Sequence, residues 1–242
     1  MPGLVTVGAP HIVVPVREGG VNRQLRYALR SWAAHLPHGR VWVVGYLPQW
    51  VKTARHLPLH QGGTKYENTT AAVRKACENP LVSDPFLLCN DDFFVMHKVK
   101  EMPVLHRGPV REVEAYYAAR ASGKYLRGMR ETAALLGEHG HPDPLSYELH
   151  VPLVVDKAQM LQALDLGSHL DVVHKRTLYG NLAQLGGEQI ADVKILHRAP
   201  TGYGAHSPFL STMPDSFANG HVGQHIRRCF PEPSLYESSG RY

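Results

Sequence analysis

Residues 85–96 read PFLLCNDDFFVM, and this stretch places two adjacent aspartates between two apolar runs. Neighbouring carboxylates inside a strand would point to opposite faces of the sheet, and burying either one without a partner is costly. The pattern therefore predicts that Asp91 and Asp92 lie at the end of a strand, where the chain bends and both can face one cation. Carboxylate oxygens suit hard ions such as Mg²⁺ or Mn²⁺, which in turn neutralise a diphosphate. The alternative is an Asn-Asp-Asp turn that closes a hairpin.

Strands and helices are expected to alternate on both sides of this stretch. HIVVPV (11–16) and RVWVVGY (40–46) are short, apolar and β-branched, which is typical of buried strands. The apolar spacing in VNRQLRYALRSWAAHL (21–36) predicts a helix, and so do the polar start and Pro80 end of ENTTAAVRKACENP (67–80). Further helices are expected at about 110–121 and 124–139, followed by a strand and a helix within 150–167.

This alternation predicts an α/β fold with a mainly parallel sheet flanked by helices. Ligands of such sheets bind at the carboxyl ends of the strands, where Arg17 and the acidic pair are expected. Residues 1–200 are expected to form a single catalytic domain. Residues 201–242 are rich in Gly, Pro and Ser, and we expect an irregular tail or lid packed on that domain.

Composition excludes several classes of protein. The formal net charge of +5 favours phosphate-bearing partners only mildly, because the sequence has no dense Lys/Arg block. No apolar run reaches the roughly 18 residues of a membrane span, and the first residues lack the features of a signal peptide. The three widely spread cysteines fit neither a disulfide framework nor a zinc site, so a cytoplasmic location is expected. Dinucleotide-binding, P-loop and hydrolase-elbow motifs are absent from the sequence.

Four stretches, in order, resemble the Stealth family of sugar-phosphate transferases. LLCNDDFFVM (87–96) resembles the family's NDDFF region, and RQLRYALRSWAAHLPHGRVWVVG (23–45) resembles its first long block. Residues 63–94 resemble the block in which an Asn-bearing helix leads to that motif, and HVPLVVDKAQMLQAL (150–164) resembles the H-x-P-x-x-x-D-K/R block. The chain is also similar to short glycosyltransferase-like proteins of actinobacteriophages, for which the expected location is the host cytoplasm.

The resemblance implies a nucleotide-diphospho-sugar transferase fold of the GT-A type, with a divalent metal at a D-x-D-like motif. It implies that Asp91 and Asp92 are metal ligands and that Asn90 orients them or the donor. It also implies that His150 lies near the reacting phosphate or the acceptor. The other residues that it implies for binding of the nucleotide sugar are Arg17, Asn22, Arg26, Lys65, Asn68 and Lys157.

His150 is the main candidate for acid–base chemistry, as a general base, a metal ligand or a donor to a developing phosphate charge. The alternative is a structural histidine. Glu148 could serve as the base instead, and strand alternation would place it on the same face as His150. Asp192 is a further candidate base, and it shares a face with Glu188 if that segment is helical.

A second polar stretch begins at HKR (174–176). A diphosphate could be held jointly by His174, Lys175 and Arg176, and a sugar could contact Tyr179 or Asn181. The alternative is a solvated loop ahead of a helix.

These features together predict a metal-dependent glycosyltransferase that uses a nucleotide-sugar donor and a hydroxyl-bearing acceptor. The acceptor could be a glycan, a protein or, less favoured, a DNA base. The first alternative is hexose-1-phosphate transfer as in Stealth proteins, although their C-terminal block is not found here. The second is an inactive module that binds a nucleotide or carbohydrate.

Overall fold

A mixed five-stranded sheet forms the centre of the protein. The computed structural model describes residues 8–119, 123–200, 202–203 and 206–238. The strand order is β3 (Arg55–Leu57), β2 (Val41–Gly45), β1 (His11–Val16), β4 (Phe86–Leu88) and β7 (Leu153–Val155). The first four strands are parallel, and β7 runs antiparallel to β4. The predicted α/β fold with a mainly parallel sheet is therefore confirmed.

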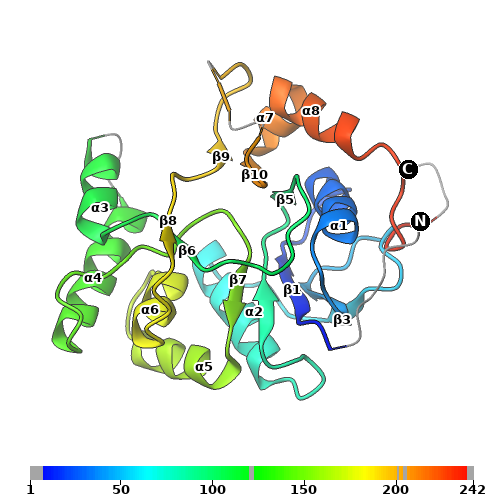
Figure 1. The fold of residues 1–242 in the computed structure, drawn as a ribbon. Coiled ribbons are helices and arrows are strands. Elements are labelled where there is room, and N and C mark those ends of the chain that lie inside the picture. The colour runs from blue at the N-terminus through cyan, green and yellow to red at the C-terminus, as the bar shows by residue number, and fades with distance from the viewer. Residues whose placement is uncertain (1–7, 120–122, 201, 204–205, 239–242) are drawn as a thin grey trace.

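Both faces of this sheet are covered by helices (Figure 1). In β1, Ile12, Val14 and Val16 pack into a core with α1 (Arg23–His35), whereas Val13 packs on the opposite side. That opposite side is covered by α2 (Lys65–Glu78), α5 (Lys157–Leu166) and α6 (Lys175–Leu182). Burial on both faces explains why β1 is a continuous apolar run rather than an alternating one.

Two smaller sheets extend the molecule beyond the acidic pair. β5 (Phe93–Val95) and β9 (Lys194–Ile195) flank β10 (Phe209–Thr212), and β6 (Leu105–His106) pairs with β8 (Glu188–Gln189). The predicted helices near 110–121 and 124–139 are present as α3 (Val110–Ala118) and α4 (Lys124–Glu138). They form a hairpin at the edge of the molecule, next to β6 and β8 (Figure 1).

The C-terminal segment is more regular than we expected. It contributes β10 to a sheet and then forms α7 (Pro214–Asn219) and α8 (His221–Cys229). Phe217, Val222 and Ile226 are buried in the same core as α1. Pro214 stands at the start of α7 and Gly220 between α7 and α8, where these residue types are favoured, so neither indicates irregular structure. The domain boundary at residue 200 stays a prediction.

Over the residues that the structure describes, no helix combines the length and the apolar character needed to cross a lipid bilayer.

Candidate active site

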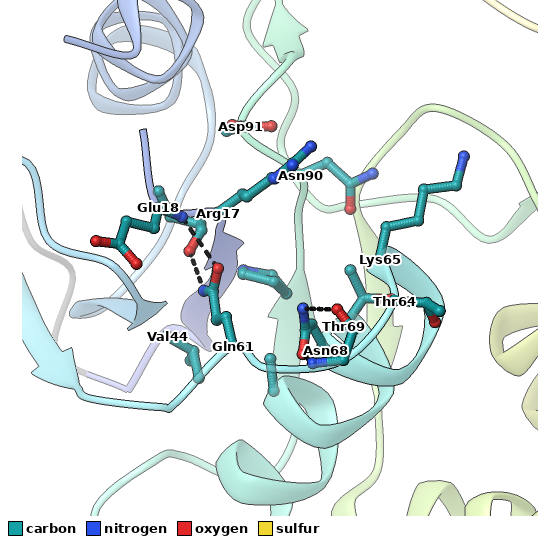
Figure 2. A pocket seen from close by; sticks show the side chains of 14 residues that line it. Arg17, Glu18, Val44, Gln61, Thr64, Lys65, Asn68, Thr69, Asn90 and Asp91 are labelled. Atoms are coloured by element: carbon teal, nitrogen blue, oxygen red, sulfur yellow. Dashed lines mark hydrogen bonds between the residues drawn. The ribbon is translucent and has the colours of Figure 1, made fainter. Parts of the chain in front are cut away.

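A cavity of about 630 Å³ lies at the carboxyl ends of β1 and β2, beside the start of α2. This volume falls in the range of about 300–1,000 Å³ that is usual for small-molecule sites. Figure 2 shows Arg17, Lys65, Asn68, Asn90 and Asp91 around the same space. Five predicted site residues from three separate segments therefore meet here, at the edge of the sheet where parallel strands place ligands.

The floor of the cavity is fixed by one glutamine. The Gln61 amide donates to the carbonyl of Val16 (2.7 Å), and its oxygen accepts from the backbone N–H of Glu18 (3.0 Å). Gly45 passes directly beneath with a φ of 104°, and a Cβ at this position would collide with Gln61 and with the Val16 carbonyl. Only glycine fits this close approach, so the loop after β1 is held rigidly against β2.

The wall opposite the acidic pair is the first turn of α2. Thr64 and Glu67 form a reciprocal capping box, and the Asn68 side chain both donates to and accepts from the backbone of Gly63 (2.8 and 3.2 Å). A helix N-terminus carries a partial positive charge. The exposed side chains of Lys65 and Arg17 add two full positive charges. This end of the cavity therefore suits an anionic group such as a diphosphate.

The acidic pair occupies a turn between β4 and β5, at a strand end as predicted. These strands belong to different sheets, so the turn links two sheets and does not close a hairpin. Asp91 lines the cavity and accepts from the Asn22 side-chain amide (2.7 Å). Asp92 faces the other way, toward β9 and β10, where Lys194 Nζ (2.7 Å) and the Ser211 hydroxyl (3.1 Å) donate to it.

The negative charges of the Asp91 and Asp92 carboxylates are balanced to different degrees by their neighbours. Asp92 has the Lys194 ammonium as its partner, whereas Asp91 has only a neutral amide. Burial, and secondarily the charge of Asp92, raises the pKa of Asp91 to about 6. A cation at Asp91 would remove this excess of negative charge.

The chemistry of these donors fits a divalent ion shared with a substrate. Among the described residues, no three His, Cys, Asp or Glu side chains converge as a metal cage. Mg²⁺ does not need one, since it is commonly held by one or two carboxylates together with substrate phosphates. Asp91 fits that kind of site, whereas Asp92, the other predicted ligand, is already engaged by Lys194 and Ser211.

His150 and Asp192 form a second polar group beside the acidic pair. His150 Nδ1 lies 2.9 and 3.0 Å from the two carboxylate oxygens of Asp192, and its ring meets the edge of Phe93. Arg107 lies 3.7 Å from the same carboxylate. Burial alone would raise the pKa of Asp192, but the hydrogen bond from His150 and the nearby positive charges outweigh it and lower this pKa. Asp192 is thus a fixed anion that orients the imidazole.

Glu148 does not share a face with His150, contrary to the strand-alternation prediction. Residues 147–150 are not in a strand, and the Glu148 carboxylate instead accepts from the backbone N–H groups of Arg176 and Thr177 at the start of α6. The condition under which Glu188 and Asp192 would share a helical face is not met, because Glu188 lies in β8 and the residues up to Asp192 are not helical.

Two basic residues predicted to bind the donor hold backbone carbonyls. Buried Arg176 donates to the carbonyls of Leu88 (2.9 Å), Leu149 (3.0 Å) and Val151 (2.7 Å). Lys157 donates to carbonyls near the amino end of β4. Because β7 is antiparallel, α5 starts at the edge of the sheet opposite the acidic pair. The loop alternative for residues 174–181 is wrong as well, since they belong mostly to buried α6.

Three other predicted residues lie beside the cavity or away from it. Asn22 caps α1 and holds Asp91 from behind. The half-buried Lys175 donates to the hydroxyl of Thr69 (3.3 Å), a cavity residue, so it lies at the rim, where burial lowers its pKa. Arg26 turns to the C-terminal segment, where its Nε lies 3.6 Å from the Glu237 carboxylate, and its guanidinium lies 4.7 Å above the Trp50 ring.

The sequence did not indicate several residues of the site. Lys194, Ser211, Arg107 and Gln61 each act through a partner 40 or more positions away. The only available signal was the spacing in ADVKI, where Asp192 and Lys194 are two residues apart and can lie on one side of an extended chain.

Comparison with known proteins adds a distant structural likeness. No protein-family model matches the chain, and no curated protein matches it. One matching solved structure is the apo-form glycosyltransferase GlyE of Streptococcus pneumoniae TIGR4, with a TM-score of 0.40 and 11% sequence identity. The match covers 76% of this chain and 46% of the GlyE chain, so the chain spans less than half of that protein's length. A likeness at this level carries no conclusion about function.

Proposed function

We propose that the protein is a metal-dependent glycosyltransferase, which moves a sugar from a nucleotide-sugar donor to a hydroxyl group of an acceptor. One observation carries the proposal. Asp91, a carboxylate with only a neutral hydrogen-bond partner, forms the wall of a cavity opposite a helix N-terminus flanked by Lys65 and Arg17. This alternation of negative and positive groups suits a cation–diphosphate pair better than either ion alone.

The donor would lie with its diphosphate between Asp91 and the start of α2. Lys65, Arg17 and the helix N-terminus stabilise the negative charge that grows on the departing phosphate. Asn68 and Gln61 hold the surrounding loop in place before the donor arrives. A Mg²⁺ or Mn²⁺ ion held by Asp91 would supply further neutralisation of the diphosphate.

His150 would activate the acceptor. Its Nδ1 is engaged by Asp192, which leaves Nε2 to take a proton from the acceptor hydroxyl. The acceptor oxygen then forms a bond to the anomeric carbon, and the bond from that carbon to the diphosphate breaks with its electron pair. The products are a glycoside, a nucleoside diphosphate and the proton held by His150. Glu148 is a weaker candidate because the start of α6 already engages its carboxylate.

Transfer of a sugar phosphate would use the same groups. In that reaction the nucleoside monophosphate leaves, and the acceptor oxygen bonds to phosphorus rather than to carbon. The mass of the product separates the two reactions, since the second product is heavier by one phosphate.

The test is a panel of nucleotide sugars scored by thermal shift and by slow donor hydrolysis, with and without Mn²⁺ or Mg²⁺. The proposal predicts that one donor stabilises the protein and is hydrolysed only when the metal is present. Asp91→Ala should abolish both effects, whereas Asp215→Ala, an exposed surface change, should abolish neither. A folded sample that a donor stabilises but that does not hydrolyse it would favour a binding module, and a folded sample that no donor stabilises would contradict the proposal.

A further inference from the structure

The α3–α4 hairpin presents a row of tyrosines beside the His150–Asp192 pair. The ring centroids of Tyr117 and Tyr125 are 5.4 Å apart, and that of Tyr125 is 4.5 Å from the centroid of His174. The row runs from Tyr117 on α3, across α4, to the start of α6. Tyr117 and Tyr125 are partly accessible to solvent and form the aromatic surface, and buried His174 supports it from below.

Arg107 joins this surface to the proposed base. Its guanidinium lies 5.3 Å above the Tyr117 ring and donates to the Tyr117 hydroxyl (3.2 Å). The same Nη1 atom lies 3.7 Å from the Asp192 carboxylate, which in turn holds His150. A molecule resting on the tyrosines would therefore lie next to the group that takes the proton.

Tyr125 has unused hydrogen-bonding capacity on this surface. Among the residues that the structure describes, none hydrogen-bonds its hydroxyl, while the carboxylates of Glu148 and Asp192 lie close enough to add to the effect of burial in raising its pKa. A hydroxyl placed among acidic groups in this way can donate to an oxygen of a ligand.

The aromatic surface also adjoins the donor cavity. Lys175, next to His174 in the chain, donates to Thr69, which lines the cavity. On the other side, the His150 ring meets Phe93, the residue that follows the acidic pair. An acceptor on the tyrosines and a donor at Asp91 would thus approach the same place from neighbouring sites.

The charges of the hairpin indicate what kind of ligand fits. The arginines that the structure describes on the two helices already have acidic partners: Arg111 pairs with Asp143, Arg127 with Glu131 and Arg130 with Glu114. A nucleic acid needs unpaired cations that follow its phosphates. Tyrosine rings next to hydrogen-bonding groups are better suited to a neutral ligand, namely a ring that has an apolar face and carries hydroxyl groups at its edges.

We propose that Tyr117, Tyr125 and Arg107 form the acceptor site and that the acceptor is a sugar residue of a glycan. The C–H face of the sugar ring rests on the tyrosine rings, and Arg107 and the Tyr125 hydroxyl bind its oxygens, so that one hydroxyl faces His150. The assignment as an acceptor rests on the glycosyltransferase function proposed above.

The test uses the full chain labelled with 3-fluorotyrosine and observed by fluorine NMR. The probes are methyl glycosides of glucose, galactose, mannose and N-acetylglucosamine, their disaccharides and a short single-stranded DNA. Tyr117→Phe and Tyr125→Phe identify the two resonances, because phenylalanine carries no label. We expect at least one saccharide to shift both resonances saturably, to leave the Tyr203 resonance unchanged, and to bind about two- to tenfold more weakly to Tyr117→Ala.

Loss of folding in an alanine variant does not affect this test, because the labelled wild-type chain gives the main result. The inference is overturned if no saccharide shifts the two resonances, or if only DNA does. Nucleotide-sugar binding is measured on the same sample by thermal shift. Donor binding without saccharide shifts would remove the acceptor site and keep the proposed function. Saccharide shifts without donor binding would keep the sugar site and remove the glycosyltransferase.

Discussion

Replacing Asp192 with asparagine tests the proposed base most sharply. The carboxylate accepts from His150 Nδ1 at 2.9 and 3.0 Å and lies in a half-buried position with Arg107 as its other charged neighbour. When His150 takes a proton, Asp192 stabilises the imidazolium through a charge-assisted hydrogen bond. Asparagine keeps the shape and one neutral acceptor but removes the charge.

The size of the effect follows from that one interaction. Hydrogen bonds to charged groups contribute about 1.5–3 kcal/mol, and each 1.36 kcal/mol in the barrier corresponds to a roughly tenfold change in rate. Asp192→Asn should therefore slow donor turnover by about 10- to 150-fold. His150→Gln removes the base altogether, for which about 10²- to 10⁴-fold is expected. The double variant should be no slower than His150→Gln, because the two residues act as one unit.

The assay is release of nucleotide from the donor into water, followed by chromatography, with nucleotide affinity measured by calorimetry on the same samples. Neither His150 nor Asp192 lines the donor cavity, so affinity should stay within about twofold of wild type. Glu188→Gln is the matched control, since it removes an exposed carboxylate from the same segment. Wild-type turnover in Asp192→Asn, or a loss explained fully by weaker nucleotide binding, would refute the role of the pair.

Three further predictions concern binding and stability. Arg17→Ala and Lys65→Ala should each weaken nucleoside diphosphate binding about fivefold, and less at high salt, as calorimetry would show; unchanged affinity would remove these groups from the donor site. Arg30 donates from Nε and Nη2 to the two carboxylate oxygens of Glu237, each at 2.7 Å. Arg30→Met leaves that buried carboxylate without its bidentate partner, so the free energy of unfolding measured by urea titration should fall by about 3–5 kcal/mol. A loss below about 1 kcal/mol would contradict this prediction. Burial lowers the pKa of His38 below its ordinary 6.5. As the pH drops below about 6.5, the unfolded chain therefore binds a proton at His38 before the folded protein does, and the free energy of unfolding falls. Between about pH 7.5 and 5.5 this fall should be smaller in His38→Gln than in wild type, and an equal fall would refute the prediction.

The parts of the fold with strong local signals could be predicted from sequence. β1 and β2 are short apolar runs buried on both faces, and α2 begins at a polar N-cap. Parallel topology then brings the carboxyl ends of neighbouring strands together. For this reason Arg17 and Asp91, which are 74 positions apart, could be assigned to one site before the structure was known.

The parts that depend on distant partners could not be predicted. Arg176 looked like a phosphate ligand because it follows a His and a Lys, yet its partners are carbonyls at residues 88, 149 and 151. The prediction that Lys157 binds the donor is wrong because β7 is antiparallel, which places the start of α5 at the edge of the sheet opposite the cavity. Lys194 belongs to the two-residue strand β9, which has too little sequence pattern to indicate that it would meet Asp92.

A crystal of the protein soaked with Mn²⁺ and the nucleoside diphosphate of the best donor tests the central claim most directly. Manganese gives an anomalous signal that locates the ion independently of the nucleotide. The account predicts one manganese peak bonded to the Asp91 carboxylate, with the diphosphate between that ion and the first turn of α2. A nucleotide bound elsewhere, such as the groove beside Phe230 and Leu235, or a nucleotide in the cavity with no manganese at Asp91, would contradict it.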